Sequence, residues 1–291
     1  MMRLILAAFA ALIVFWTTPA FAWGDSGHRT VCEIAYRNLT PRARTEIAGL
    51  LPSSGQHRNI GWACTYADHP HVRGSEHYVN YQRSEMSPGP GCGVAAQCVL
   101  TAIDADLAIV ANPSATAAAR RRALMFLGHW VGDVHQPLHA SYGDDRGGGR
   151  VNSRGLCSRG LHATWDTCIL EYRQLGQNAS LARVRGLAGT WDRDPAITPA
   201  MRASWRATPH WQWATESYAI GIQPWVSYCI MQQGACWYST TNQTFVQGQA
   251  RSVNIDRAYM DSAMPVIQRR VTQAGIRLAH LLNDALDLNY S

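Results

Sequence analysis

Lysine is absent from this chain of 291 residues, and all 26 of its basic residues are arginine. Because the acidic residues number 20, the formal net charge is +6. A genome rich in G and C is one explanation of the arginine bias. Attraction to a polyanion is another, because the planar guanidinium suits phosphate. The charge therefore permits nucleic-acid binding without proving it.

No Cys-x-x-Cys motif occurs among the eight cysteines. Its absence argues against a thiolate zinc site, a redox motif or an attached haem. Two pairs are close in sequence, and we predict that Cys92 bonds to Cys98 and Cys229 to Cys236, because short loops are readily closed by disulfides. The sequence leaves open how the remaining four pair, namely Cys32, Cys64, Cys157 and Cys168.

A second long apolar run is absent, which excludes a polytopic membrane protein. The one long run, LILAAFAALIVFW, follows Arg3 and precedes TTPAFA, in which Ala20 and Ala22 have the spacing of a signal peptidase site. A transmembrane anchor is the alternative, but the run is short and Pro19 follows it. We predict a signal peptide over residues 1–22 and a secreted or periplasmic protein whose mature chain starts at Trp23.

Internal repeats and long linkers are also missing, and hydrophobic residues make up 47% of the chain. We therefore predict one mostly α-helical, disulfide-stabilised domain over residues 23–291. Apolar residues at three- and four-residue spacing predict helices over 26–39, 41–51, 99–111, 115–136, 160–175, 179–190, 198–219 and 254–287. Thr40-Pro41 reads as a helix cap followed by a first-turn proline. Glycine and proline predict loops over 87–93 and 143–150, and we expect a short hairpin within 221–253.

Histidine and aspartate are concentrated in HWVGDVHQPLH, residues 129–139. His129 and Asp133 are four residues apart, so they share one face of a helix. Pro137 ends that helix, and His139 beyond it is able to fold back toward the same cluster. Downstream, GLHATWD repeats the spacing with His162 and Asp166. Neutral imidazole and carboxylate are both ligands of zinc.

Further candidates precede this segment. The stretch ACTYADHPHVRGSEHYVN offers Asp68, His69, His71 and His77, of which only some need be ligands. In WGDSGH, His28 lies five residues after Trp23, and signal cleavage would free the α-amino group of Trp23. That amine loses its proton near neutral pH when it binds a metal, so the two groups make a chelating pair.

Each of these side chains taken alone is explained as well by an ordinary hydrogen-bonded core residue. The whole set is not, because burying several histidines and carboxylates together without cations is very costly. His135 points away from the face of His129 and Asp133, and we expect it to support the ligands from behind. We assign no role to His57, His210 and His280.

The motifs resemble those of the S1/P1-type nuclease family, and they occur in the family's order. They are Trp23 to His28, ACTYAD, HYVN, GDVHQPLH, DRGGG and LHATWD. Members of this family are secreted enzymes with three zinc ions that cut single-stranded DNA and RNA and remove 3′-phosphates from nucleotides. The resemblance implies their helical fold, which is related to that of zinc-dependent phospholipase C, and it implies no protein partner.

The resemblance also implies a sorting of the ligands. Asp68, His77, His129 and Asp133 would hold one zinc. The amine and carbonyl of Trp23, His28 and the second oxygen of Asp133 would hold its neighbour, and His139, His162 and Asp166 the third. The interval from Asp68 to His77 is shorter than in fungal members, so His69 or His71 is able to replace a ligand. The family's GGN motif is replaced by Gly147-Gly148-Gly149.

By the same resemblance we expect Asp68 to act in catalysis by orienting the attacking oxygen, and the product to carry a 5′-phosphate. Tyr78 is either a base-stacking residue or an ordinary packed aromatic, and Arg146 is a candidate phosphate contact. Thr167 replaces an asparagine that often helps fungal enzymes hold a base, so base preference stays open.

Two rival functions remain. One rival is a zinc-dependent phospholipase C, but that enzyme has glutamate where this chain has Asp166. A phospholipase also needs an exposed apolar surface for lipid, and tryptophans 205, 211, 213, 225 and 237 would supply one if they were exposed. The other rival is a zinc-binding export protein without catalysis, whose metal sites would be closed to water.

Overall fold

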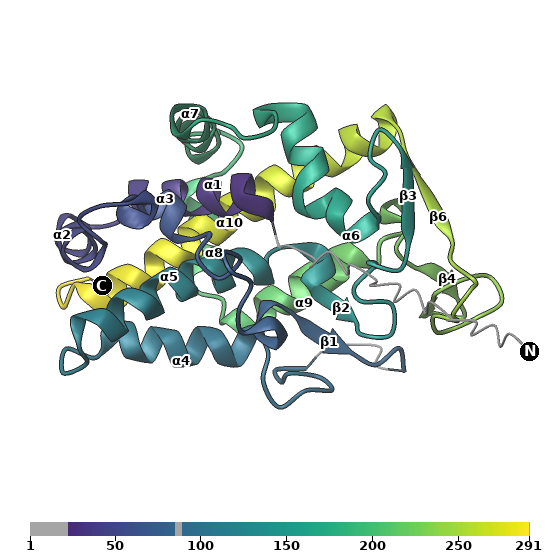
Figure 1. Cartoon of the computed structure of the whole chain (residues 1–291), viewed down its shortest axis with the longest axis horizontal. Coiled ribbons are helices and arrows are strands. Elements are labelled where there is room, and N and C mark those ends of the chain that lie inside the picture. Colours follow the sequence, from purple (N-terminus) through teal and green to yellow (C-terminus); the bar gives the residue numbers. More distant parts are fainter. Residues whose placement is uncertain (1–22, 85–88, 291) are drawn as a thin grey trace, which may run out of the picture.

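The computed structural model describes residues 23–84 and 89–290, and these form one mostly helical domain (Figure 1). The predicted signal peptide, residues 85–88 and Ser291 lie outside the described residues, so the first two residues of the loop predicted at 87–93 are not described. The helices are α1 (Gly24–Arg37), α2 (Pro41–Leu50), α3 (Ile60–Ala63), α4 (Val99–Ala111), α5 (Ala117–Val134), α6 (Leu161–Ala163), α7 (Leu181–Asp192), α8 (Pro199–Arg206), α9 (His210–Gly221) and α10 (Arg257–Leu286). In the part of the chain that the structure describes, no helix is long and apolar enough to cross a membrane.

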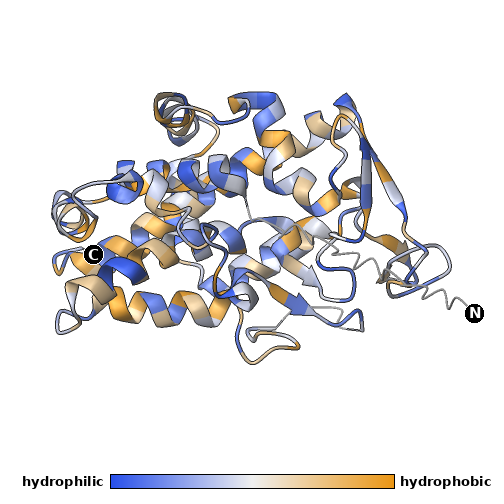
Figure 2. Ribbon diagram, in the orientation of Figure 1, coloured by the Kyte–Doolittle hydropathy of each residue, from blue (hydrophilic) through white to orange (hydrophobic). Residues whose placement is uncertain are grey.

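Helix α10 is the longest element and lies at the centre of the domain, where it packs against α1, α5 and α8 (Figure 1). Helices α4 and α5 pack against each other, and so do α1 and α7. Colouring by hydropathy shows apolar stripes on several of these helices, alternating with polar ones (Figure 2). Burial of such stripes is what stabilises amphipathic helices in a domain.

The predicted helices are confirmed with three differences. Residues 198–219 form two helices, α8 and α9, because Pro209 provides no amide hydrogen and precedes the first residue of α9. Residues 254–255 belong to a strand, and α10 begins only after Asp256, whose side chain accepts a hydrogen bond from the Tyr259 amide. Thr40 caps α2 as expected, accepting from the amide of Ala43.

The third difference lies in the helix predicted at 160–175. After α6 it continues in wider π turns over Thr164–Cys168 and Glu171–Leu175. Such turns are rare and are frequent at functional sites.

Short strands complete the fold. The predicted hairpin is present as β4 (Ile230–Gln232) and β5 (Ala235–Trp237), an antiparallel pair. Two parallel pairs were not predicted: β1 (Val79–Tyr81) with β2 (Ala140–Tyr142), and β3 (Asn152–Gly155) with β6 (Ser252–Ile255). With strands this short, the alternation of apolar and polar residues is too brief to recognise in the sequence.

Four disulfides join the chain. The two predicted bonds, Cys92–Cys98 and Cys229–Cys236, are present. The open question is settled by Cys32–Cys64 and Cys157–Cys168. The first of these ties α1 to the end of α3.

Candidate metal centre

Helix α5 supplies the middle of a buried cluster of histidines and carboxylates. The side chains of His129 and Asp133 are fully buried and project together, with His129 Nε2 3.3 Å from Asp133 Oδ2. Gly128 lets α5 come close to the Cys32–Cys64 disulfide, because a Cβ atom at this position would lie 2.3 Å from Cys64 Sγ. The same approach allows the Cys64 carbonyl to accept a hydrogen bond from His129 Nδ1 at 2.8 Å.

Asp68 and His77 join these two residues in a first group. His77 Nδ1 lies 3.1 Å from both His129 Nε2 and Asp133 Oδ2. Asp68 Oδ1 lies 3.8 Å from His77 Nδ1 and 3.7 Å from His129 Nε2. Ligands at about 2.0 Å from a tetrahedral zinc are about 3.3 Å from one another. The four atoms therefore have the mutual spacing of a tetrahedral ligand set.

The tautomers of the imidazoles explain why this spacing needs a cation. A backbone carbonyl is only an acceptor, so His129 Nδ1 carries the proton that it donates to Cys64. His77 Nε2 likewise donates to the Val72 carbonyl at 3.0 Å. The inward nitrogens of the two rings are then both lone pairs, 3.1 Å apart and facing the carboxyl group of Asp133. Such a set repels itself unless a positive ion lies between its members.

A second group lies on the other side of Asp133. His28 of α1 places Nε2 3.2 Å from Asp133 Oδ1, and its ring stacks on that of His129 with centroids 3.8 Å apart. Gly132 makes room for this ring, because a Cβ atom there would lie 2.7 Å from His28 Nδ1. Trp23 is buried at the start of α1, and its carbonyl accepts from the Gly27 amide at 3.0 Å.

The third group is formed after α5. His139 follows in the 3₁₀ turn Pro137–His139, and His162 and Asp166 come from α6 and its π continuation. The Nε2 atoms of the two histidines are 3.1 Å apart, and they lie 3.7 and 3.6 Å from the oxygens of Asp166. Both Nδ1 atoms donate to carbonyls, that of His139 to His77 at 2.6 Å and that of His162 to Gly147 at 2.7 Å. Here too, two lone pairs face each other.

Buried polar atoms in these groups find no hydrogen-bond partner among the described residues. They are both nitrogens of His28, both oxygens of Asp133, and Oδ2 of Asp68 and of Asp166. Buried polar groups are rarely left in this state. Because the donor set is imidazole nitrogen and carboxylate oxygen without thiolate, it fits a divalent metal such as zinc.

Burial decides the charges in the absence of a cation. It lowers the pKa of His28 to about 3 and those of His77 and His139 to about 4, so these rings are neutral at neutral pH. Burial, with Asp68 and Asp166 nearby, raises the pKa of Asp133 well above its ordinary value. Burial also raises the pKa of Asp166 to about 7. A cation would oppose this effect of burial, because a nearby positive charge favours the ionised form of both carboxyl groups and lowers their pKa.

The structure distinguishes the two histidines between Asp68 and His77 that were possible replacement ligands. His71 Nδ1 lies 3.3 Å from Asp68 Oδ1 and its ring stacks on His77, so it borders the first group. His69 instead pairs with Asp25 at 2.8 Å, where both side chains are exposed. His71 is therefore the nearer substitute for a ligand.

The histidines to which no metal role was assigned do have other partners. His135, which we expected to support the ligands, is buried and donates from Nδ1 to the Val131 carbonyl, while Arg277 donates to its Nε2, and neither partner is a proposed ligand. His210 lies 3.3 Å from Asp104, and His280 is within hydrogen-bond distance of the Tyr290 hydroxyl. His57 packs edge-on against Tyr66.

Sequence reasoning missed the groups that hold the ligands in place. The Gln136 amide donates to Asp166 Oδ1 at 2.6 Å. Asp106 accepts hydrogen bonds from Trp130 and Arg73, and Trp130 packs edge-on against His77. The carbonyls that accept from the histidines belong to residues whose side chains carry no signal, so a sequence pattern does not reveal them.

A cavity of about 320 Å³ opens beside the first and third groups. It is lined by His71, Gly74, His77, Tyr78, Asn80, Leu138, His139, Gly143, Arg146, Gly147 and His162. Of the predicted substrate contacts, Tyr78 and Arg146 are exposed and belong to this lining. Thr167 is half-buried against Gly24 and is not among the described residues that line the cavity.

Comparison with known proteins agrees with the resemblance seen in the motifs. A family model described as S1/P1 Nuclease matches residues 23–287. The chain belongs to the S1/P1 nuclease family. Three curated relatives are Endonuclease 2 of Arabidopsis thaliana, Nuclease S1 of Aspergillus oryzae and Nuclease P1 of Penicillium citrinum, at 27%, 25% and 24% identity. Each match covers 90% of this chain, and 89%, 91% and 97% of the respective relatives.

Membership of the family and the geometry agree on one statement. Within the described residues, three buried or partly buried groups of histidine and aspartate are able to hold metal ions. The family places the protein among nucleases, which are hydrolases.

Proposed function

We propose that the protein is a secreted endonuclease that uses three zinc ions to hydrolyse phosphodiester bonds of single-stranded DNA and RNA. The product carries a 5′-phosphate, and 3′-nucleotides lose their phosphate at the same site. The observation that carries the proposal is the set of inward-facing imidazole lone pairs around Asp133, which are placed to bind cations. The relatives named as endonucleases and nucleases supply the substrate class.

We assign the ligands as the motifs imply. Asp68, His77, His129 and Asp133 form one site. The Trp23 amine and carbonyl, His28 and Asp133 form the next, and His139, His162 and Asp166 the third. The metals, when bound, would lower the pKa of water to near neutrality and stabilise charge on the leaving oxygen.

The remaining steps fall to side chains of the chain itself. Burial raises the pKa of Asp68, but the hydrogen bond with His71 and nearby histidines outweigh it and lower the pKa, so the carboxylate is ionised. Its Oδ2 is then able to accept a hydrogen bond from the attacking water and to orient it. Arg146 lies at the rim of the cavity, where it contacts a phosphate of the substrate.

Tyr78 supports the preference for single strands. Its ring is 38% exposed and lines the cavity next to His77. A base stacks on such a ring only if its face is free, and a paired base inside a duplex does not offer its face. Thr167 stays a candidate contact to substrate from the side of Gly24.

The tryptophans do not form the exposed apolar surface that a phospholipase would need. Trp205 and Trp213 are buried, and Trp211, Trp225 and Trp237 are each partly buried. A surface for a lipid membrane would need them exposed. The third site also has Asp166 rather than glutamate.

One experiment tests the proposal against both rivals. The protein starting at Trp23 is incubated with single-stranded DNA, duplex DNA and phosphatidylcholine, each with and without a chelator. We expect fast cleavage of single-stranded DNA to 5′-phosphate products, slow cleavage of duplex, and loss of both with the chelator. Hydrolysis of phosphatidylcholine with inert DNA would favour the phospholipase, and no hydrolysis would favour the zinc-binding protein.

Secretion is proposed from the predicted signal peptide and the four disulfides, which persist in oxidising compartments. Expression of the full sequence with its own first 22 residues tests it. The expected result is exported protein whose N-terminal residue is Trp23 by mass spectrometry. Retention of an uncleaved chain in the cytoplasm would contradict it.

A further inference from the structure

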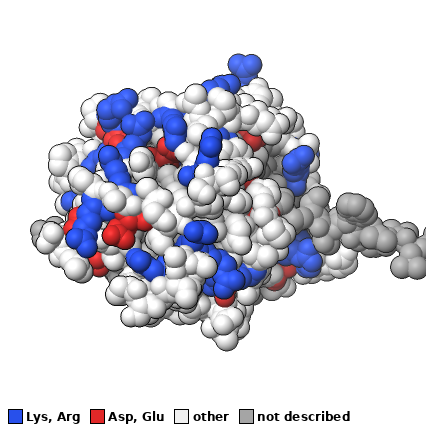
Figure 3. Space-filling model, turned by 60° about the vertical axis from the view of Figure 1, so that its left-hand side comes forward, with Lys and Arg blue, Asp and Glu red and all other residues white. Residues whose placement is uncertain are grey.

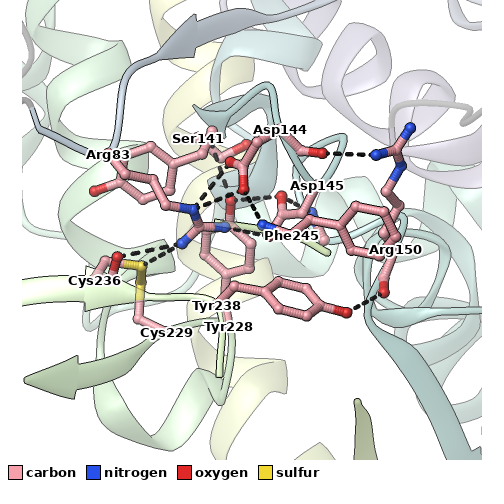
Figure 4. A network of polar contacts seen from close by, with 12 residues as sticks. Arg83, Ser141, Asp144, Asp145, Arg150, Tyr228, Cys229, Cys236, Tyr238 and Phe245 are labelled. Carbon is pink, nitrogen blue, oxygen red and sulfur yellow. Dashed lines mark hydrogen bonds and ion pairs between the residues drawn. A yellow bond between two sulfur atoms is a disulfide. The ribbon is translucent and has the colours of Figure 1, made fainter. Parts of the chain in front are cut away.

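The loop of residues 143–150 is fastened by one buried guanidinium. The Arg83 side chain is 3% exposed. Its Nε donates to both oxygens of Asp144 at 3.0 Å, and Nη2 donates to Asp145 Oδ2 at 2.6 Å (Figure 4). Charge-assisted hydrogen bonds of this kind are the strong ones. Two consecutive carboxylates of the loop are thus held by a single side chain.

The same loop borders the metal centre. Asp145 Oδ1 accepts from the Gly148 amide and from the Tyr228 hydroxyl, both at 3.0 Å. Between Asp145 and Gly148 lie Arg146, which lines the cavity, and Gly147, whose carbonyl accepts from His162 Nδ1 at 2.7 Å. The position of that carbonyl is therefore set by the way Asp145 is held.

The backbone at Gly147 is confined as well. Its φ is +59°, and a Cβ atom there would lie 2.6 Å from the Leu138 carbonyl oxygen and 3.1 Å from His162 Nδ1. The loop thus touches the imidazole without an intervening side chain. A small displacement of the loop would change the hydrogen bond that fixes the tautomer and ring angle of His162.

We propose that Arg83 is a positioning residue for the third metal site. By holding Asp144 and Asp145 it fixes the 143–150 loop, and the Gly147 carbonyl then orients His162 so that Nε2 faces His139 and Asp166. The proposal rests on the proposed function in taking this group as a metal site.

The contacts explain why this residue is arginine. Besides the two carboxylates, Nη1 donates to the Cys236 carbonyl at 3.3 Å, and the guanidinium lies 4.6 Å from the centre of the Tyr142 ring. Only a planar fork reaches all these partners at once, and the ammonium of lysine is a compact point charge. Without the guanidinium, the fully buried Asp145 would lose its cation, and burial already raises the pKa of this carboxyl.

A matched pair of variants separates positioning from general stability. Arg83→Gln removes the guanidinium that donates to Asp144 and Asp145. Arg251→Gln is the control, because Arg251 is also at least partly buried, beside Tyr238, but donates to the carbonyls of Ser227 and Tyr228. Arg83→Lys keeps the charge and loses the fork, and it serves as the test variant if Arg83→Gln fails to fold.

The first readout needs neither metal nor activity. In the metal-free protein, the Nδ1 proton of His162 is observed by NMR, since a hydrogen bond to a carbonyl protects it from exchange. We expect this signal to be lost in Arg83→Gln and in Arg83→Lys and to be kept in Arg251→Gln. An unchanged signal in a folded Arg83 variant would overturn the proposal.

The second readout is metal binding. We expect Arg83→Gln to lower the binding affinity for one of the three metals by about 10- to 100-fold. Losses of this size are typical when a ligand loses the hydrogen-bond partner that orients it. kcat for single-stranded DNA should fall more than KM changes. If the unaltered protein holds no metals, the proposed function is wrong, and the NMR comparison still decides the role of Arg83. If it holds three and Arg83→Gln keeps all of them with normal affinity, the function stands and the positioning role is wrong.

Discussion

At the scale of residues, the candidate site depends on which nitrogen of each histidine carries the proton. His77, His129, His139 and His162 each donate to a backbone carbonyl. Their other nitrogens are lone pairs directed inward. Since burial also keeps these rings neutral, they bind a metal without first losing a proton at neutral pH. The site is arranged for cations before any cation arrives.

Asp133 is the residue whose loss should be most informative. Its Oδ1 faces His28 at 3.2 Å and its Oδ2 faces His77 at 3.1 Å, so it serves two groups. We predict that Asp133→Asn loses more than one metal, since an amide presents a single oxygen and no negative charge. Elemental analysis of the purified variant measures this.

Asp261→Asn is a suitable control, because Asp261 forms a surface ion pair with Arg173. It should keep the metal content of the unaltered protein. If Asp133→Asn lost only one metal, Asp133 would not bridge two sites.

Much of this site was predictable, and the limits have physical causes. The spacing of four residues brings His129 to Asp133 and His162 to Asp166 because both pairs lie on helices, where one turn returns to the same face. Asp68, His71 and His77 lie in turns and a short 3₁₀ segment, whose path depends on tertiary contacts. Hence the sequence could not say whether His69 or His71 would lie near Asp68.

At the scale of elements, α10 is tied to α9 and to the end of α5 by a buried polar network. Glu216 of α9 accepts hydrogen bonds from Arg270 and Arg277, whose side chains are 2% and 0% exposed. Arg270 also donates to the His135 carbonyl at 3.1 Å. The helix that carries the ligands is thereby fixed to the centre of the domain.

We predict that Glu216→Gln destabilises the fold by about 3 kcal/mol, because the buried guanidiniums of Arg270 and Arg277 would lose their carboxylate partner, which is itself 33% exposed. Asp104→Asn is the control, since Asp104 pairs with His210 at the surface and should contribute little. Chemical denaturation at neutral pH measures both changes. Equal stability of the two variants would show that the network is not what fixes α10.

The same residue gives a dependence on pH. Burial alone would raise the pKa of Glu216, but the hydrogen bonds from Arg277 and the charge of Arg270 outweigh it and lower the pKa below its ordinary value of 4.5. A carboxylate with a lowered pKa stabilises the fold above the unfolded value and loses that contribution as pH falls through the folded one. The difference in stability between the protein and Glu216→Gln should therefore be full above pH 4.5 and shrink in stronger acid. A difference that grew in acid would have the wrong sign.

Helix α1 gives another prediction, which concerns Trp23, the residue directly before it. Trp23 is buried and, in our proposal, contributes its free amine to the second site. One additional residue before Trp23 would convert that amine to an amide, which has no basic lone pair. We predict lower metal content and activity reduced by orders of magnitude, with the helical fold kept.

A residue added after Ser291 is the control for this extension. Metal content, turnover of single-stranded DNA and circular dichroism are compared for the two proteins. Equal metal content and equal activity would show that Trp23 is not a ligand.

Helices were easier to predict than strands for a physical reason. A long helix such as α4 or α5 repeats its apolar residues over three or more turns, and each further turn strengthens the evidence for a helix. The pairs β1–β2 and β3–β6 have three or four residues per strand and join segments far apart in the chain. Their pairing follows from how the helices pack, so local sequence says little about it. The apolar pattern continues on both sides of Pro209, so we predicted one helix over 198–219 although this proline ends the hydrogen-bonding pattern between α8 and α9.

At the scale of the whole molecule, the charge agrees with a polyanionic substrate. Arginine side chains outnumber carboxylates on the face shown in Figure 3. Four arginines line a surface hollow between α1, α2 and α7 together with two acidic residues: Arg37, Arg44, Arg185 and Arg193 with Glu33 and Asp192. Spread over the surface, such charges attract nucleic acid without reading its sequence. They are consistent with a nuclease.

In the proposed enzyme, three metal sites share one buried cluster of histidines and carboxylates. The most direct measurement is the metal content of the protein that starts at Trp23, purified without chelator and analysed for all divalent metals. We predict about three metals per chain, mainly zinc, because the ligand atoms of three groups of histidine and aspartate lie close enough together for each group to hold a cation. A value near one, or none after dialysis against zinc, would contradict the trinuclear site and the hydrolytic chemistry built on it.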